Sequence, residues 1–351
     1  MIIKKVEVIP YLLDFKFLAG TSRGVLKQKK TCFIKIYTDD GVGVGEAGPL
    51  ERLSIDDLPD FHLVFEQELK SLVGQSISNI EDVDTISLPQ NMPSLRFGVE
   101  TALRSLLHGK KHLIFDNAFS RSQDSIGING LIWMGDKEFM FSQIQSKLDQ
   151  GFACLKMKIG AIDFETELEL LAYIRKQFAK DDLVLRVDAN GAFSTSNALD
   201  KLTRLSQFDL HSIEQPIQQR QWEEMSLLCE KTPIPIALDE ELIGVLDEDK
   251  DKLLDVIKPQ FIILKPTLVG GIKASSEWIE KAEKRNISWW ITSALESNIG
   301  LNAIAQYTYE TGNKMPQGLG TGQLYTNNID SPLVLDGDRL WYDQNSIWTK
   351  I

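Results

Sequence analysis

Cysteine and histidine are scarce in this chain of 351 residues, which has 3 cysteines and 4 histidines. Cys32, Cys154 and Cys229 are far apart, odd in number and form no Cys-x-x-Cys pair. The sequence therefore predicts neither a disulfide framework nor a cysteine-ligated metal site.

Long apolar runs and an excess of positive charge are also absent. The longest uncharged run, residues 315–329, has 15 residues and is largely polar, so no segment is expected to span a bilayer. The first seven residues interrupt their apolar run with lysines and offer no cleavage site, which favours a first strand over a signal peptide. The formal charge of −12 argues against nucleic acid or an anionic membrane as a partner. We expect a cytoplasmic enzyme with a small-molecule substrate. A homo-oligomer is compatible with this composition but is not specified by it.

The first 118 residues place strands before helices. Strands are expected at 5–12, 31–38 and 42–47, and helices at 60–73 and 94–108. This order predicts a small α+β domain. The spacing Gly43-x-Gly45-x-x-Gly48 matches a dinucleotide fingerprint, but Pro49 and a polar loop follow it where a helix is required, so a hairpin strand is favoured.

Residues 119–321 alternate short apolar strands with helices. Candidate strands lie near 126–131, 154–160, 183–190, 210–215, 235–240, 261–266, 288–293 and 316–320. Eight such repeats predict an α/β fold with a modified TIM barrel of the (β/α)₈ type. The irregular tail, residues 322–351, is expected to pack back on the N-terminal domain.

Charged side chains occupy one face of several barrel strands. Lys156 and Lys158 alternate with apolar residues, and Asp188 and Asn190 do so on the next strand, so these groups should face the barrel axis. A buried charge costs on the order of several kcal/mol unless it is paired or bound to a metal. A functional site is therefore favoured over a structural one.

The spacing of the charged strand ends supports a shared site. Successive intervals are 30, 26, 25 and 26 residues along the series Lys158, Asp188, Glu214, Asp239 and Lys265. Each interval is one strand–helix unit, so the groups should lie at the same height at the carboxyl ends of the strands, where barrel active sites are built. Three carboxylates need a cation in a dry pocket, and hard oxygen ligands suit Mg²⁺, for which Mn²⁺ can substitute.

Lys158 and Lys265 lie on either side of these carboxylates in the strand order. We expect them on opposite faces of a ligand held by the metal. A lysine beside a divalent cation and another lysine has a lowered pKa and can act as a base. The predicted chemistry is proton abstraction α to a carboxylate, with Mg²⁺ holding the resulting enediolate.

The ordered motifs resemble a known family over nearly the whole chain. Lys156-x-Lys158, Asp188-Ala189-Asn190, Glu214-Gln215-Pro216, Asp239-Glu240 and Lys265-Pro266 resemble the muconate-lactonising subgroup of the enolase superfamily. Within that subgroup, residues 128–133, residues 263–266 with Gly270-Gly271, and residues 318–322 resemble the o-succinylbenzoate synthase family.

This resemblance implies a Mg²⁺-dependent dehydratase with an N-terminal capping domain. The implied reaction is syn elimination of water from 2-succinyl-6-hydroxy-2,4-cyclohexadiene-1-carboxylate, which gives o-succinylbenzoate in menaquinone biosynthesis. Lys158 would be the base and also the acid that protonates the departing hydroxyl. Lys265 would stabilise the enediolate from the opposite face, and Lys156 would assist Lys158 electrostatically. Asn190 and Glu240 would support the metal ligands from outside.

Contacts to the substrate are expected from three places. The resemblance makes residues 15–30 a mobile capping loop, in which Arg23 meets a substrate carboxylate, whereas the residues alone are equally consistent with a surface loop and a charged strand edge. Ser293 ends the next strand and either binds the second carboxylate or caps a helix. The neutral rim of Gly318, Gly320 and Thr321 suits a succinyl carboxylate held by backbone N–H groups.

Two other functions remain open. An N-succinylamino acid racemase or a dipeptide epimerase uses the same lysines and metal, but epimerases typically place carboxylates on the last strand, and residues 318–322 have none. A barrel without catalysis that binds a small anion or a protein partner should have lost one of the five charged strand ends. All five are present, which disfavours a barrel without catalysis. The absence of carboxylates from residues 318–322 favours the synthase over the racemase and the epimerase.

Overall fold

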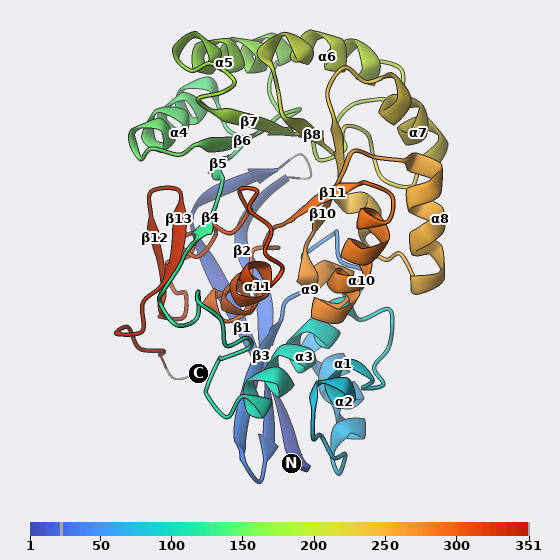
Figure 1. The fold of residues 1–351 in the computed structure, drawn as a ribbon, viewed down its shortest axis with the longest axis vertical. Helices are drawn as coiled ribbons and strands as arrows, with labels where there is room; N and C mark the ends of the chain where they lie inside the picture. Colours follow the sequence, from blue (N-terminus) through green and yellow to red (C-terminus); the bar gives the residue numbers. More distant parts are fainter. Residues whose placement is uncertain (22–23, 350–351) are drawn as a thin grey trace.

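The computed structural model describes residues 1–21 and 24–349. Its N-terminal part is an antiparallel sheet in the order β1-β2-β3, with helices against one face (Figure 1). The strands are β1 (Ile3–Thr21), β2 (Gly24–Thr38) and β3 (Gly41–Ala47), and the helices are α1 (Phe61–Leu69), the 3₁₀ turn Lys70–Leu72, α2 (Ile80–Asp84) and α3 (Pro93–Leu107). Alternate residues of β2, such as Ile34 and Ile36, pack against Val99 and Leu103 of α3, as their period-2 and helical spacing predicts.

Close packing explains the glycines of β3. A Cβ atom on Gly43 would lie 2.2 Å from the Ala102 carbonyl oxygen, and one on Gly45 would lie 1.9 Å from the Gly98 carbonyl oxygen. These glycines therefore let α3 approach the sheet.

In the described residues 15–21 and 24–30, the expected strand edge is confirmed and the interpretation as a loop is wrong. This segment is the outer half of the β1–β2 hairpin, in which pairing resumes after an irregularity at Asp14–Ala19, with Ala19 opposite Leu26 and Gly20 opposite Val25. The hairpin crosses from the N-terminal sheet to the barrel (Figure 1). Exposed charged side chains on one face, such as Lys27, hide the alternation that would have indicated strands.

The barrel prediction is confirmed, with seven parallel strands in the described residues. They are β5 (Gly130–Ile132), β6 (Cys154–Lys158), β7 (Val184–Asp188), β8 (Ser212–Glu214), β9 (Ile236–Leu238), β10 (Phe261–Leu264) and β11 (Ser288–Ile291), adjacent in that order. The helices around them are α4 (Lys137–Asp149), α5 (Phe164–Gln177), α6 (Ala198–Leu205), α7 (Trp222–Lys231), α8 (Asp247–Ile257), α9 (Pro266–Val269), α10 (Gly271–Glu283) and α11 (Asn298–Glu310), with 3₁₀ turns at Ser206–Phe208 and Glu240–Leu242.

The eighth expected strand, at 316–320, is reduced to two isolated parallel bridges. Gln317 pairs with Ile128, and Gly318 pairs with Thr292. A Cβ atom on Gly318 would lie 2.0 Å from Thr292 Oγ1, so the glycine permits this close closure of the barrel. The candidate strand at 126–131 is likewise divided, because only β5 belongs to the barrel, and β4 (Ile126–Gly127) pairs with the tail.

The C-terminal tail contacts both parts of the molecule. Strands β12 (Leu333–Asp336) and β13 (Arg339–Tyr342) form a hairpin that pairs with β4. Before this hairpin, Tyr325 forms a bridge with Phe15 of β1, and Asn327 Oδ1 accepts a hydrogen bond of 2.8 Å from the Asp14 backbone N–H. The domain boundaries expected at residues 118 and 321 stay predictions.

Two buried carboxylates of the N-terminal part cap barrel helices. Glu46 of β3 accepts hydrogen bonds of 2.9 Å from the backbone N–H groups of Ser297 and Gly300, at the start of α11. Glu100 of α3 accepts from the N–H groups of Ile272 (2.6 Å) and Lys273 (3.1 Å), at the start of α10. A carboxylate is favourable at a helix N-terminus, so both contacts fix the N-terminal part on the barrel. In the described part of the chain, no helix has the length and apolarity needed to cross a bilayer.

Candidate active site

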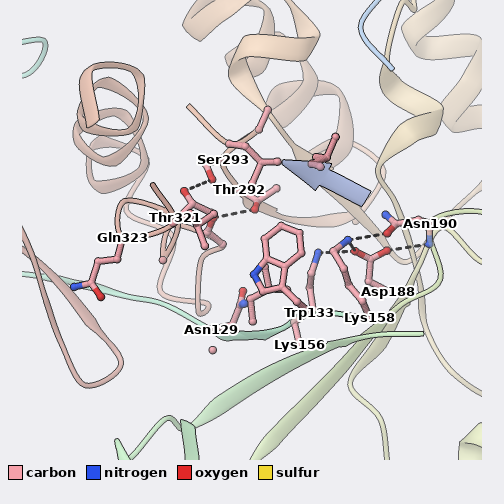
Figure 2. Close-up of a pocket in the computed structure, with 18 of the residues that line it drawn as sticks. Asn129, Trp133, Lys156, Lys158, Asp188, Asn190, Thr292, Ser293, Thr321 and Gln323 are labelled. Atoms are coloured by element: carbon pink, nitrogen blue, oxygen red, sulfur yellow. Dashed lines mark hydrogen bonds and ion pairs between the residues drawn. The ribbon is translucent and has the colours of Figure 1, made fainter. Parts of the chain in front are cut away.

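A cavity of about 360 Å³ lies at the carboxyl ends of the barrel strands (Figure 2). Its charged floor consists of Lys156, Lys158, Asp188 and Lys265, and the neutral amide of Asn190 lies beside them. Its walls include Phe17, Val25 and Leu26 of the hairpin, Leu50, Glu51 and Arg52, the β5 region from Ile128 to Trp133, Thr292 to Leu295, and Gly318, Gly320, Thr321, Gln323 and Leu324. The volume suits a small ligand, and the mixture of apolar walls and a few charges is typical of a binding site.

Strand β6 presents the first two lysines to this cavity, because Leu155 and Met157 take the alternate positions in the barrel core. The Lys156 Nζ atom lies 2.6 Å from Glu214 Oε2 and 3.0 Å from Asp188 Oδ2. Both lysines are nearly buried, so these charges lie in a low-dielectric environment in which pairing is required.

Lys158 has two partners at the end of β7. Its Nζ atom lies 2.8 Å from Asp188 Oδ2 and 2.7 Å from Asn190 Oδ1 (Figure 2). Asn190 has a left-handed backbone, φ 44°, and its N–H donates to Asp188 Oδ1 across 3.0 Å. The Asn190 amide nitrogen also donates to Glu240 Oε1 across 3.0 Å. Asn190 therefore orients both the lysine and a carboxylate of the site.

Lys265 follows β10 and pairs with Asp239, which follows β9. Three strands, β7 to β9, separate β6 from β10 in the sheet, so Lys265 enters the site from the side opposite Lys158. The structure thus brings together the five charged strand ends that the sequence indicated. Glu214 and Asp239 lie beneath the cavity floor, almost fully buried.

The charges shift one another's pKa values strongly. Burial alone would lower the pKa of Lys156, but the Asp188 and Glu214 carboxylates outweigh burial and raise it well above its usual value. Burial alone would likewise lower the pKa of Lys265, but the nearby carboxylates, Asp239 above all, outweigh burial and raise this pKa. Burial and the neighbouring Asp188 raise the pKa of Glu214 well above its usual value. Carboxylates are the nearest partners of the Lys156 and Lys265 ammonium groups, which explains the upward direction of both pKa values. The lowered lysine pKa expected beside a bound divalent cation stays a prediction.

The donor set fits a hard divalent cation, although the ligands are not gathered around one point. Among residues 1–21 and 24–349, no three His, Cys, Asp or Glu side chains lie together in a group that could hold a metal ion. The Lys156 ammonium group lies between Asp188 and Glu214 instead, and the Lys265 ammonium group pairs with Asp239. Glu214 Oε1, however, is buried without a hydrogen-bond partner, which is costly for a carboxylate oxygen and leaves a ligand atom available.

The predicted substrate contacts are only partly consistent with the structure. Ser293 Oγ lies 2.6 Å from Thr321 Oγ1, and both line the cavity. Ser293 does not cap a helix, because Ser297 is the N-cap of α11. Gly318 lines the cavity, but its N–H donates to Ile291 O across 2.9 Å and is not available to a carboxylate. Gly318 as a substrate contact stays a prediction. Gly320 lines the cavity. Arg23 lies outside the described residues.

Sequence reasoning did not assign Trp133, Arg52 or Leu295 to the site, although all three line the cavity. The Lys158 Nζ atom lies 6.0 Å from the centre of the Trp133 ring, which in turn lies 5.9 Å from the ring of Phe17. The alternation that continues beyond β5 could have indicated Trp133. Arg52 and Leu295 lie in loops, where no periodicity applies.

Glu296 has a structural role that the sequence did not reveal. Its carboxylate accepts hydrogen bonds from the Ala294 N–H (2.7 Å) and from Thr267 Oγ1 (2.5 Å). It therefore ties the loop after β11 to the first turn after β10.

Known proteins share both the sequence and the fold. Residues 140–342 match the family of enolase C-terminal domain-like proteins. An o-succinylbenzoate synthase from Desulfotalea psychrophila is 49% identical over 93% of this chain and 96% of its own length. The crystal structure of MenC from Desulfotalea psychrophila LSv54 superposes with a TM-score of 0.84 at 42% identity, covering 97% of this chain and 99% of that one.

Epimerases are more distant relatives. The L-Ala-D/L-Glu epimerase from Bacillus subtilis is 24% identical over 94% of this chain and 87% of its own length. Its substrate-liganded structure superposes with a TM-score of 0.83 at 20% identity, covering 97% of this chain and 96% of that one, which shows a shared fold alone. The chain therefore belongs to the o-succinylbenzoate synthase family, carbon–oxygen lyases of the enolase superfamily.

Proposed function

We propose that Lys158 and Lys265 carry out the syn elimination of water that converts 2-succinyl-6-hydroxy-2,4-cyclohexadiene-1-carboxylate to o-succinylbenzoate, as a step of menaquinone biosynthesis in the cytoplasm. The observation that carries this proposal is the pair of lysines entering one cavity from β6 and β10, with carboxylates between them. The relative that is 49% identical supports the choice of reaction.

Lys158 supplies both proton transfers in this proposal. Its neutral amine removes the proton α to the ring carboxylate, and the electron pair of the broken C–H bond moves into the carboxylate to give an enediolate. That pair then returns to form the new C=C bond as the C–O bond breaks. The resulting ammonium returns the proton to the departing hydroxyl, which leaves as water, and the amine is regenerated. One residue suffices because a syn elimination places both transfers on one face. Asn190, 2.7 Å from the Lys158 Nζ atom, orients it for both steps.

Lys265 remains a cation on the opposite face and stabilises the charge that develops on the substrate carboxylate. Lys156 remains an ammonium beneath Lys158, because two carboxylates hold it charged. Its positive charge assists Lys158 electrostatically, as the family resemblance implies.

Asp188, Glu214 and Asp239 would hold Mg²⁺, or Mn²⁺ in its place. When bound, the ion supplies Lewis-acid stabilisation of negative charge on the substrate carboxylate. With the three carboxylates engaged in this way, Lys156 and Lys265 would share these counter-charges with the ion. The unpartnered, buried Glu214 Oε1 supports this assignment.

The second carboxylate of the substrate needs its own receptor. The adjacent hydroxyls of Ser293 and Thr321 offer two donors in the cavity wall, beside Gly320. Arg23 is retained as a further receptor on sequence grounds. Arg52 lines the same cavity, and its side chain is 72% exposed, so it offers a cation at the rim.

The racemase and epimerase alternatives have weaker support. An N-succinyl-L-Arg/Lys racemase from Bacillus cereus is 23% identical over 80% of this chain. Residues 318–322 contain no carboxylate to hold an α-ammonium group, which disfavours a dipeptide. A binding protein without catalysis would not need to keep both lysines paired with buried carboxylates.

The test is mass-resolved product formation. The purified protein with Mg²⁺ is given the cyclohexadiene carboxylate in one reaction and an N-succinyl amino acid in D₂O in another. We expect loss of one water from the first substrate, with kcat/KM far above that for deuterium incorporation into the second. Faster deuterium incorporation, with no dehydration, would support the racemase instead.

A further inference from the structure

Leu295 has a backbone conformation that leucine rarely adopts. Its φ angle is 66°, in the left-handed region that favours glycine or asparagine and is unfavourable for a branched side chain. Such conformations persist only where surrounding contacts hold them, and they occur preferentially at functional sites.

Hydrogen bonds hold Leu295 on both sides. The Tyr325 hydroxyl donates to the Leu295 carbonyl oxygen across 2.7 Å. The Ala294 N–H before it donates to the Glu296 carboxylate across 2.7 Å, and Ser297 after it donates its N–H to Glu46. The loop is therefore fixed from the tail, from the barrel and from the N-terminal sheet. These bonds hold the backbone of Leu295 and of its neighbours, and the backbone in turn sets the direction of the Leu295 side chain.

The side chain connects the two N-terminal segments that cover the cavity. It packs against the cluster formed by Phe15, Trp133 and Tyr325 at the hairpin, and against the cluster that contains Leu50 near residue 52. Leu295 itself lines the cavity and is only partly buried. Part of its apolar surface therefore remains available to a ligand.

We propose that Leu295 is a specificity-determining residue, whose side chain contacts the ring of the substrate and sets the width of the apolar part of the cavity. This inference rests on the proposed function, because a six-membered carbocycle with two acidic arms needs one apolar wall between two polar ends. The charged floor lies at one end, and the Ser293 and Thr321 hydroxyls supply the other. Leu295 follows Ser293 by two residues, lines the same cavity and packs against the two clusters described above.

Leu295→Ala and Leu295→Gly form a matched pair of variants. Both remove the isobutyl contact, but only glycine relieves the left-handed backbone, so the glycine variant should have the higher Tm. If the side chain contacts the ring, both variants lose about 10- to 100-fold in kcat/KM, mainly through KM. Leu295→Met, which restores similar apolar volume, should retain kcat/KM to within about 3-fold of the unmodified protein.

A binding measurement separates specificity from simple destabilisation. Kd values are measured by calorimetry, with Mg²⁺ present, for o-succinylbenzoate and for its bulkier naphthalene analogue. The unmodified protein should prefer the benzene compound, and the alanine and glycine variants should reduce that preference by about 10-fold or more. A preference unchanged in both variants, or full kcat/KM in the glycine variant, would overturn the proposal. Absence of product from the unmodified protein would instead defeat the proposed function, and the ratio of Kd values would still decide the role of Leu295.

Discussion

Lys158 and Asn190 are joined by a hydrogen bond of 2.7 Å between the lysine ammonium and the side-chain oxygen of the asparagine. The contact links the end of β6 to the end of β7, and Asn190 in turn donates its N–H to Asp188. The catalytic base proposed here is thus oriented by a residue that also orients a proposed metal ligand.

Asn190→Ala should therefore lower kcat by about 10- to 100-fold, the usual effect of removing a group that orients a catalytic residue. The Tm should also fall, because alanine is less favourable than asparagine at a φ of 44°, so kcat is compared at a temperature where both variants are folded. Steady-state kinetics and a thermal melt check this, with Asn197→Ala, at an exposed helix start, as the matched control. A kcat equal to that of the control would show that Asn190 does not orient Lys158.

Removal of divalent ions should abolish turnover, because three buried carboxylates would lose their proposed cation. Treatment with EDTA followed by dialysis should leave no dehydration, and Mg²⁺ or Mn²⁺ should restore it. Ca²⁺, which is larger and takes more ligands, serves as the comparison ion. Full activity in protein shown to be metal-free by elemental analysis would exclude Asp188, Glu214 and Asp239 as a required metal site.

Gly271→Ala should destabilise the fold through the contact between the N-terminal part and the barrel. A Cβ atom there would lie 2.2 Å from Glu100 Oε2, at φ 99°. We expect a loss of about 2–4 kcal/mol in the free energy of unfolding. Gly74→Ala is the control, because its φ of 91° imposes similar backbone strain and no atom lies within 4 Å of the new Cβ. Its expected cost is about 1 kcal/mol. Equal losses in the two variants, measured by urea denaturation, would contradict the proposed contact.

Glu167 should make the unfolding free energy depend on pH. Burial raises the pKa of its carboxyl from 4.5 to about 7, and Oε1 accepts the Gly160 N–H across 2.6 Å, just beyond Lys158. The folded state therefore retains a proton that the unfolded state loses, so this contribution is present below pH 4.5 and is lost as the pH rises through 7. Relative to Glu167→Gln, the unmodified protein should lose stability between pH 4.5 and 7. Urea denaturation of both proteins at several pH values checks the sign, and a constant difference would contradict the raised pKa.

Much of the site followed from one property of barrels. Strand ends spaced by one strand–helix unit lie at the same height, so the intervals from Lys158 to Lys265 indicate a shared site from the sequence alone. Alternation within β6 likewise indicated which lysines face inward. These inferences use local periodicity, which the chain shows wherever strands are buried on both faces.

Other features depended on contacts that periodicity does not encode. The outer part of the β1–β2 hairpin is as compatible with a loop as with a strand edge on sequence alone, because it keeps charged side chains such as Lys27 in solvent. The last barrel strand is replaced by single bridges because Gly318 closes against Thr292 at a distance that only glycine allows. The position of Leu295 depends on Tyr325 and Glu46, which are far away in the sequence.

The turnover of Lys158→Ala tests the central claim most directly. The variant is given the cyclohexadiene carboxylate at saturating Mg²⁺, with Lys265→Arg as a companion that keeps the cation on the opposite face. We predict that Lys158→Ala loses about 10⁴-fold or more in kcat, because base and acid are both removed. Lys265→Arg should retain part of the dehydration but no racemisation. A kcat for Lys158→Ala within about 10-fold of the unmodified protein, with deuterium exchange at the α-carbon intact, would contradict the assignment of Lys158 as the base.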